Sequence, residues 1–229
     1  MRKLFIDLKY YFIVCLLFIG MSFLGVLTYG KLNFHLIVNQ YNSSFQDIFF
    51  KYFTNVGDGL FAVLILLILL FLVKIRTFFI GLSSFLLSGL VCQLMKKIFF
   101  VNQLRPIKFF SADQLHFVEG VVLRTNNSFP SGHSTTAFAI FLFLAYVFKN
   151  KNYQIIFAVI ACLTAYSRVY LSQHFFADVA AGGLIGIGTF LISYSVIISI
   201  KIKWFDKTIK SLFKNKSKNK KVSIELNLN

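Results

Sequence analysis

Residues 167–200 read SRVYLSQHFFADVAAGGLIGIGTFLISYSVIISI. The first twelve residues include an arginine, a histidine and an aspartate, and the rest is an apolar run without a charge. An α-helix needs about 20 apolar residues to cross the core of a bilayer. Residues 179–200 therefore predict a membrane-spanning helix whose entrance carries polar side chains. Small residues let a second helix approach closely, and this run has four glycines: Gly182, Gly183, Gly186 and Gly188.

The rest of the chain has the same apolar character. Of its 229 residues, 57% are hydrophobic and 14% are charged, too apolar a composition for an ordinary soluble domain. We expect an all-α, integral membrane six-helix bundle formed by residues 1–200, followed by a basic cytoplasmic tail at 201–229. The five other spans are expected at residues 10–29, 59–73, 78–95, 134–148 and 153–170.

The formal charge of +16 does not indicate a nucleic-acid-binding protein, because nine of the 24 basic residues fall after residue 200 beside the last span. Such a run is typical of a membrane-surface segment. With both termini in the cytoplasm, 16 of the 24 basic residues lie inside, as the positive-inside rule requires. Residues 101–133 and 167–178 then face outward. The three cysteines are isolated in apolar stretches and indicate neither a disulfide framework nor a thiolate metal site.

Three polar clusters lie at helix ends on this outer side. The first contains Lys96 and Lys97, followed by Arg105 and a proline; the planar guanidinium could clamp a phosphate, and the proline would stiffen the turn. The second is Pro-Ser-Gly-His at 130–133, where a serine can cap the next helix and a glycine lets backbone N–H groups approach an anion.

The third cluster is Ser167-Arg168, then His174, then Asp178. If a helix begins near His174, the i, i+4 spacing puts the imidazole and the carboxylate on one face. Asp178 could then accept the Nδ1–H of His174 and leave Nε2 free to attack. His35 and His116 have no neighbouring partner in the sequence, and we interpret them as loop histidines.

Together the clusters supply what phosphoryl transfer needs: cations for the phosphoryl oxygens, a nucleophile, an orienting carboxylate and an acid for the leaving oxygen. His133 fits the role of the acid. No carboxylate cluster with metal-ligand spacing accompanies these residues, so we expect no metal and no cofactor.

The clusters resemble the three-part signature of the type-2 phosphatidic acid phosphatase and vanadium haloperoxidase superfamily. That signature is a lysine and Arg-Pro, then Pro-Ser-Gly-His, then Ser-Arg, five residues, His, three residues, Asp. PSGH at 130–133 and SRVYLSQHFFAD at 167–178 match it without departure, and the resemblance spans residues 97–178.

The resemblance implies that His174 is the nucleophile through a phosphohistidine, that Asp178 is its partner and that His133 is the general acid. The implied phosphate-binding residues are Lys97, Arg105, Ser131, Gly132 and Arg168. The family places six residues between the lysine and the arginine, whereas seven follow Lys97 and eight follow Lys96. We predict that Lys97 is the motif lysine and that residues 101–104 absorb the extra residue.

The function expected from this resemblance is hydrolysis of a membrane lipid phosphate or diphosphate at the non-cytoplasmic face of a bacterial inner membrane. The alternatives are a vanadate-dependent haloperoxidase-like enzyme and a non-catalytic membrane transporter. Undecaprenyl diphosphate, phosphatidylglycerol phosphate, phosphatidate and lipid A phosphate all fit an outward-facing site. We expect the loop at 107–128, with Asp113, His116, Glu119 and Arg124, to select among them.

Overall fold

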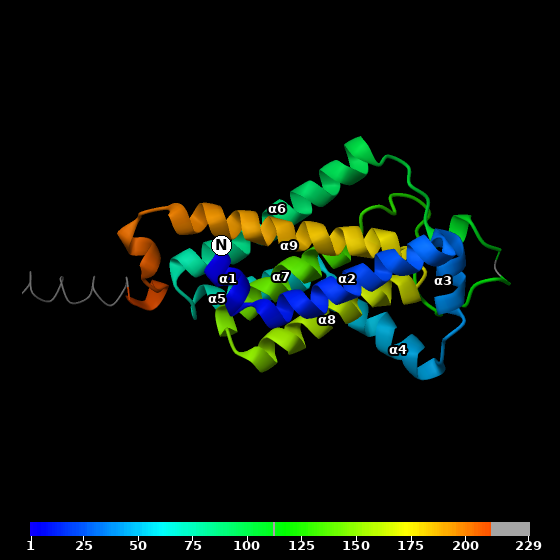
Figure 1. Cartoon of the computed structure of the whole chain (residues 1–229), viewed down its shortest axis with the longest axis horizontal. Coiled ribbons are helices and arrows are strands. Elements are labelled where there is room, and N and C mark those ends of the chain that lie inside the picture. The colour runs from blue at the N-terminus through cyan, green and yellow to red at the C-terminus, as the bar shows by residue number, and fades with distance from the viewer. Residues whose placement is uncertain (112, 212–229) are drawn as a thin grey trace, which may run out of the picture.

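The protein is a bundle of helices arranged along one long axis (Figure 1). The computed structural model describes residues 1–111 and 113–211; most of the expected tail, residues 212–229, lies outside this part of the chain. Within the described part there is no β-strand beyond an isolated bridge between Lys74 and Thr208. The α-helices are α1 (Arg2–Asp7), α2 (Lys9–Tyr29), α3 (Lys31–Asn39), α4 (Ser44–Phe53), α5 (Gly59–Leu70), α6 (Ile75–Leu94), α7 (Gly132–Phe148), α8 (Lys151–Tyr170) and α9 (Phe176–Ser199). Shorter helical segments are η1 (Thr54–Gly57), η2 (Met95–Phe99), η3 (Pro106–Lys108) and η4 (Lys203–Asp206).

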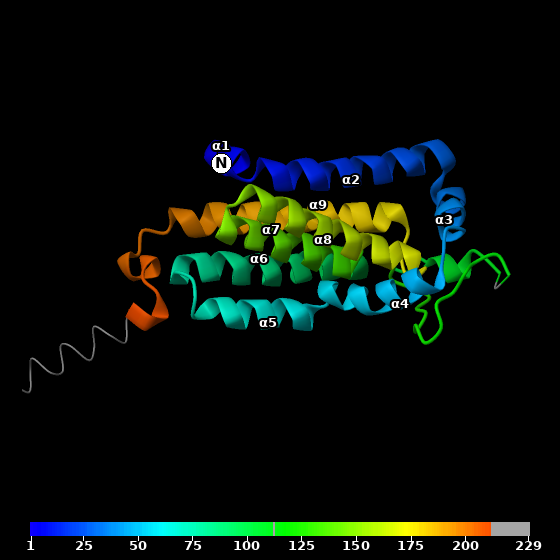
Figure 2. The same cartoon turned by 90° about the horizontal axis from the view of Figure 1, so that it is seen from below.

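Helix α7 occupies the centre of the bundle. It packs against α6, α8 and α9, and its side chains from Ala137 to Ala145 are all buried. Helix α2 covers α8 and α9 from one side, while α5 lies beside α6 on the other side (Figure 2). Because α7 is apolar around its whole circumference, it is buried as a core helix of the bundle.

The ends of α7 and the start of α8 follow from local sequence signals. Ser131 is the N-cap of α7, and its side chain accepts from the N–H of Ser134. The helix ends where Lys149 adopts a left-handed backbone conformation, with φ of 54°. Asn150 then caps α8 by accepting from the N–H of Asn152. A polar cap at each start supplies a partner for N–H groups that a helix cannot satisfy itself.

Two of the four glycines of α9 allow the close approach to α7. A Cβ atom at Gly182 would lie 2.6 Å from the carbonyl oxygen of Ser131, and one at Gly186 would lie 2.5 Å from that of Thr135. At Gly188, in contrast, nothing lies within 4 Å of such an atom. The expected close packing of glycines is therefore found along one face of α9 and does not extend to Gly188.

Each of the six expected spans corresponds to a helix of the structure. Four helices, α2, α6 extended by η2, α8 and α9, are long and apolar enough to cross a membrane, and a bent pair formed by α4 with η1 and α5 would be a fifth. This pair bends by 56° at Asp58, which caps α5 by accepting from the N–H of Leu60. Helix α7 has 17 residues. The sequence pattern located α5 and missed α4, because polar residues interrupt 44–58.

Large apolar side chains cover the outward faces of the bundle. Leu27 of α2 is 81% exposed and Leu60 of α5 is 78% exposed, as lipid-facing residues would be. The N-terminus and η4 lie at one end of the bundle, whereas α3, α4 and the long connection from α6 to α7 lie at the other (Figure 2). The polar clusters fall at this second end.

Candidate active site

Four helix ends meet where α3, α4 and the long connection close the bundle. The C-terminal ends of α6 and α8 bring Lys96 and Arg168, and the N-terminal ends of α7 and α9 bring His133 and Asp178. His174 lies in the turn between α8 and α9. A pocket of about 820 Å³ opens here, and His133, His174, Lys96 and Arg168 all line it.

His174 and Asp178 lie side by side, both almost completely buried, with exposures of 2% and 3%. The imidazole Nδ1 is 3.5 Å from Asp178 Oδ2 and has no other partner within the described residues. The backbone N–H of His174 donates to the carbonyl oxygen of Arg168. Since Nδ1 faces the carboxylate, Nε2 is the nitrogen left for the pocket. Helix α9 begins two residues after His174, so the pairing forms across a turn rather than on the helix face we expected.

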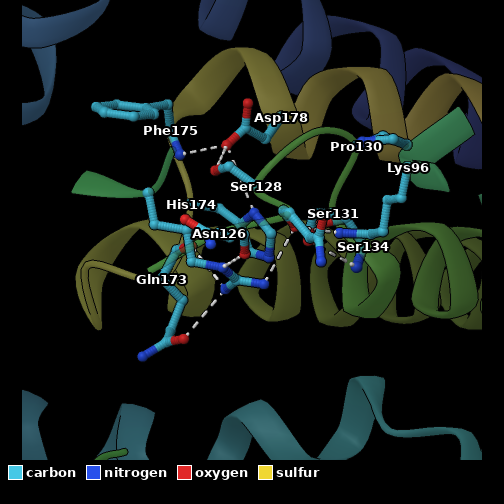
Figure 3. A network of polar contacts seen from close by, with 12 residues as sticks. Lys96, Asn126, Ser128, Pro130, Ser131, Ser134, Gln173, His174, Phe175 and Asp178 are labelled. Carbon is cyan, nitrogen blue, oxygen red and sulfur yellow. Dashed lines mark hydrogen bonds and ion pairs between the residues drawn. The ribbon is translucent and has the colours of Figure 1, made fainter. Parts of the chain in front are cut away.

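The carboxylate of Asp178 is held by more than the histidine. Its Oδ2 accepts from the Ser128 hydroxyl and, at 3.0 Å, from the backbone N–H of Phe175 (Figure 3). The second bond caps the first turn of α9. Ser128 comes from the long connection, 50 residues from Asp178, and no signal in the sequence pointed to it.

Burial sets the protonation state of His174. It lowers the pKa of His174 to about 3, because a charged imidazole would lose its hydration there, and the cation of Arg105 acts in the same direction. At neutral pH the ring is therefore uncharged and has a free nitrogen lone pair, which is the form that attacks phosphorus.

Arg105 is buried against backbone oxygens. Its Nε donates to Asn126 O at 2.9 Å, its Nη1 donates to the carbonyl and side-chain oxygens of Gln173 at 2.9 and 3.2 Å, and its Nη2 donates to Asn127 O at 3.3 Å. Burial, and then the charge of Arg124, lower the pKa of Arg105 to about 10, so it stays charged at neutral pH. Most N–H groups of the Arg105 guanidinium, which we expected to bind two phosphate oxygens, thus donate to oxygens of the protein. One Nη2 proton remains for a ligand.

Arg168 offers a clearer anion contact. Its Nη1 donates to the Thr54 hydroxyl at 2.7 Å, which fixes the guanidinium from η1. Its Nε is buried and has no hydrogen-bond partner among residues 1–111 and 113–211. A buried donor without a partner is costly, and a phosphoryl oxygen in the pocket would supply one.

The structure places Lys96 at the pocket, whereas we expected Lys97 there. Lys96 is 8% exposed, lines the pocket and donates to Asn127 O at 2.6 Å, whereas Lys97 is exposed and does not line the pocket. In Figure 3 the Lys96 side chain extends towards the loop that carries Ser131. The reason is a π-helical turn at η2, closed by a bond from Phe100 N to Met95 O. A π-turn takes in one residue more than an α-turn, so part of the extra length lies at the lysines and not only in 101–104.

Ser131 also differs from expectation, whereas Gly132 does not. Gly132 and His133 line the pocket, but Ser131 is completely buried and does not. Its hydroxyl caps α7, and its N–H donates to the carbonyl oxygen of Asp178 at 2.9 Å. Both of its polar groups are therefore engaged within the protein. Ser131 joins the starts of α7 and α9 rather than facing a ligand.

A buried polar network supports the turn that carries His174. Ser172, with φ of 51°, contacts His35 Nε2 at 3.2 Å and Asn39 Nδ2 at 3.3 Å. The interpretation of His35 as a loop histidine is wrong, because it lies on α3 and is buried. His116 is in the long connection, where its Nε2 lies 2.8 Å from Asp47 Oδ1.

Several pocket residues were not predicted as site residues from the sequence. Lys51 and Thr54 come from α4 and η1, which the apolar pattern missed, and Gln173 lies beside His174 without a recognisable motif. Asp58 is the one carboxylate among the residues lining the pocket. No group of three or more His, Cys, Asp or Glu side chains that could hold a metal occurs in the described part of the chain. Metal independence stays a prediction for experiment.

The fold and the site define a class: a helical membrane protein with a buried histidine, a supporting carboxylate and a set of cations at one end of its bundle. A model of the PAP2 superfamily matches residues 77–200. The chain belongs to this superfamily, and the resemblance seen in the three-part signature is confirmed. It is an integral membrane protein.

Relatives and a solved structure agree with this classification. The chain is 29% identical to the lipid A 4'-phosphatase of Porphyromonas gingivalis over 57% of this chain and 56% of that protein. It is 34% identical to phosphatidylglycerophosphatase B of Bacillus subtilis over 39% of this chain and 44% of the relative. The chain thus spans about half the length of these curated relatives. The crystal structure of Aquifex aeolicus LpxE matches with a TM-score of 0.64 and 27% identity, covering 72% of this chain and 94% of the other.

Proposed function

We propose that this protein hydrolyses the phosphate of a membrane lipid phosphate or diphosphate through a phosphohistidine on His174. The observation that carries the proposal is the buried imidazole of His174, beside Asp178, in a pocket lined by basic side chains. Relatives named as lipid A phosphatase and phosphatidylglycerophosphatase support a lipid substrate. The apolar outer faces of the bundle support it as well, because a bilayer that covered these faces would have the pocket at its edge.

The proposed reaction has two steps. First, Nε2 of His174 forms a bond to phosphorus while the bond from phosphorus to the leaving oxygen breaks. His133 takes up a proton when the anionic phosphate binds, because the negative charge favours the imidazolium, and it gives that proton to the leaving oxygen. Asp178 stabilises the positive charge that develops on the ring of His174. Water then attacks the phosphohistidine, gives its proton to His133 and releases phosphate with His174 restored.

The phosphoryl oxygens are proposed to contact four residues: Lys96, Arg105, Arg168 and Gly132. Lys96 replaces Lys97 in this role, and Ser131 is left out, because of the burial and bonding described above. A vanadate-dependent oxidant enzyme would use a similar pocket, but the relatives are named as phosphatases, which favours hydrolysis.

The direct test is chemical quenching of the reaction with a phosphorus-labelled lipid phosphate in the presence of EDTA. We expect an acid-labile, base-stable adduct at His174, and we expect its amount to be unchanged by the chelator. Asp178→Asn should bind substrate and form the adduct slowly, because a wrongly oriented ring loses transition-state stabilisation more than ground-state binding. Full turnover by His174→Ala would exclude the proposal, and activity that EDTA abolishes and magnesium restores would exclude metal independence.

We also propose that the pocket faces the periplasm or the outside of a bacterial inner membrane, with both termini in the cytoplasm. The support is the distribution of lysines and arginines along the sequence. A cysteine introduced at Ser111, in the long connection, should react with a membrane-impermeant thiol reagent on intact cells. A cysteine at Ser211, after η4, should react only after the cells are opened, and the opposite pattern would reverse the orientation.

A further inference from the structure

The pocket is larger than a single phosphoryl group requires. Its volume of about 820 Å³ is near the upper end of the range of roughly 300–1,000 Å³ for small-molecule sites. Five basic side chains line it, and we divide them by their contacts. Lys96 and Arg105, buried against backbone oxygens of the loop at 126–127, and Arg168, whose Nε is buried, form the inner group.

The outer group consists of Lys51 and Arg124. Lys51 is on α4 and donates from Nζ to the carbonyl oxygen of Glu119 at 2.7 Å, so the long connection fixes its position. Gly120, with φ of 73°, leaves room for this ammonium, since a Cβ there would lie 2.7 Å from it. Arg124 is exposed and makes no hydrogen bond or ion pair with any other residue of the described chain.

The charges of the pocket are poorly balanced by the protein itself. Asp58 is the one carboxylate among the lining residues, and its Oδ1 is engaged in capping α5. Burial is the main cause of the lowered pKa of Arg105, and the charge of Arg124 lowers it further. Anionic ligands relieve such repulsion. One phosphoryl group at His174 accounts for the inner group and leaves the charges of Lys51 and Arg124 without an anionic partner among the described residues.

We propose that Lys51 and Arg124 form a second anion subsite that binds another phosphoryl group of the same substrate. The substrate class is therefore a lipid with two phosphoryl groups, and this inference rests on the hydrolysis proposed above. In a diphosphate, the bond from the terminal phosphorus to the bridging oxygen breaks and the lipid monophosphate leaves. In a lipid with two separate phosphates, the bond to an alcohol oxygen breaks, and the second phosphate stays on the product.

The experiment compares three substrates with one lipid tail: a monophosphate, a diphosphate, and a bisphosphate whose phosphates are on different carbons. The wild-type enzyme should prefer one or both of the last two. In Lys51→Ala, Arg124→Ala and the double variant, the ratio of kcat/KM between that substrate and the monophosphate should fall about 10- to 100-fold, the scale of lost charge-assisted hydrogen bonds. If the variants lose the preference for the diphosphate, the subsite binds the phosphoryl group next to the broken bond. If they lose the preference for the bisphosphate, it binds a phosphate on another carbon of the lipid.

Two further variants separate charge from structure. Lys51→Gln keeps a donor for the Glu119 carbonyl and removes the charge, so it should lose the preference as Lys51→Ala does. Lys108→Ala removes a basic residue from the same end of the protein that is exposed and does not line the pocket, and it should keep the wild-type ratio. An equal loss of kcat/KM on all three substrates in the Lys51 and Arg124 variants would overturn the subsite.

A binding measurement keeps the subsite testable apart from catalysis. Methylenediphosphonate should bind the wild-type protein more tightly than methylphosphonate, and the Lys51 and Arg124 double variant should bind the two equally. If no lipid phosphate is hydrolysed but this difference is found, the proposed function fails and the subsite stands. If hydrolysis proceeds and the double variant retains the full difference in binding, the subsite fails and the proposed function stands.

Discussion

Lys96→Ala should inactivate the enzyme, and Lys97→Ala should not. Lys96 is buried at the pocket, whereas the neighbouring side chain is exposed away from it. Removing one preorganised charged contact to a transition state costs roughly 2.7–4 kcal/mol, or about 10²- to 10³-fold in kcat. An exposed lysine near the membrane surface contributes about 1 kcal/mol. We therefore expect at least a tenfold gap between the two variants.

The loss at Lys96 should be catalytic more than structural. Its Nζ donates to Asn127 O, but that carbonyl oxygen also accepts from Arg105 Nη2 at 3.3 Å. The loop thus keeps one anchor when Lys96 is removed. Thermal stability of the purified variant should change little, while kcat/KM falls.

The assay measures kcat/KM of both variants at equal membrane expression, with Lys96→Met as a variant that keeps most of the side-chain volume. Lys96→Met should be as inactive as Lys96→Ala, because the ammonium carries the effect. An inactive Lys97→Ala beside an active Lys96→Ala would refute the placement of these two residues and restore the assignment made from sequence spacing.

Two other outcomes follow from the burial of His174 and from the glycine face of α9. Because burial lowers the pKa of His174 to about 3 instead of its usual 6.5, the ring stays neutral as the pH falls through 6. Histidine NMR of the purified protein should therefore show no titration of His174 near pH 6.5. A histidine signal that titrates there and is missing from the spectrum of His174→Ala would contradict this. Gly186→Ala should lower thermal stability, since its Cβ would lie 2.5 Å from Thr135 O, and Gly188→Ala, with open space, should preserve or raise it. Equal melting temperatures of the two variants would contradict the close contact.

The parts of the site that the sequence predicted well are local in the chain. His174 and Asp178 are four residues apart, and such a short separation fixes their proximity in a turn or a helix. The Pro-Ser-Gly-His segment likewise predicts the start of a helix, because its serine can act as an N-cap. Ser128 approaches Asp178 across 50 residues, and only the packing of the long connection against α9 brings it there.

The positions where the structure differs from the sequence-based expectation have a related origin, because they depend on backbone geometry and packing. Residue spacing gives no sign of the π-turn at η2, and one added residue rotates Lys96 rather than Lys97 towards the pocket. For Ser131, the sequence showed that it could cap a helix and could also face an anion, but it could not show that capping and the bond to Asp178 O would occupy both polar groups. Among the helices, α4 was missed because polar and charged residues interrupt its apolar side chains, of which only Phe50 is buried.

The carboxylate of Asp178 belongs to the architecture as much as to the chemistry, because the oxygen beside His174 also receives the N–H of Phe175 at the start of α9. Selection can act separately on the two functions of Asp178, supporting His174 and capping α9. A descendant that abandoned catalysis would be free to replace His174 but would still need an acceptor to begin its last helix. Asp178 should therefore be retained in inactive relatives of this protein. Among such sequences, the histidine would distinguish active enzymes from inactive ones, and the aspartate would not.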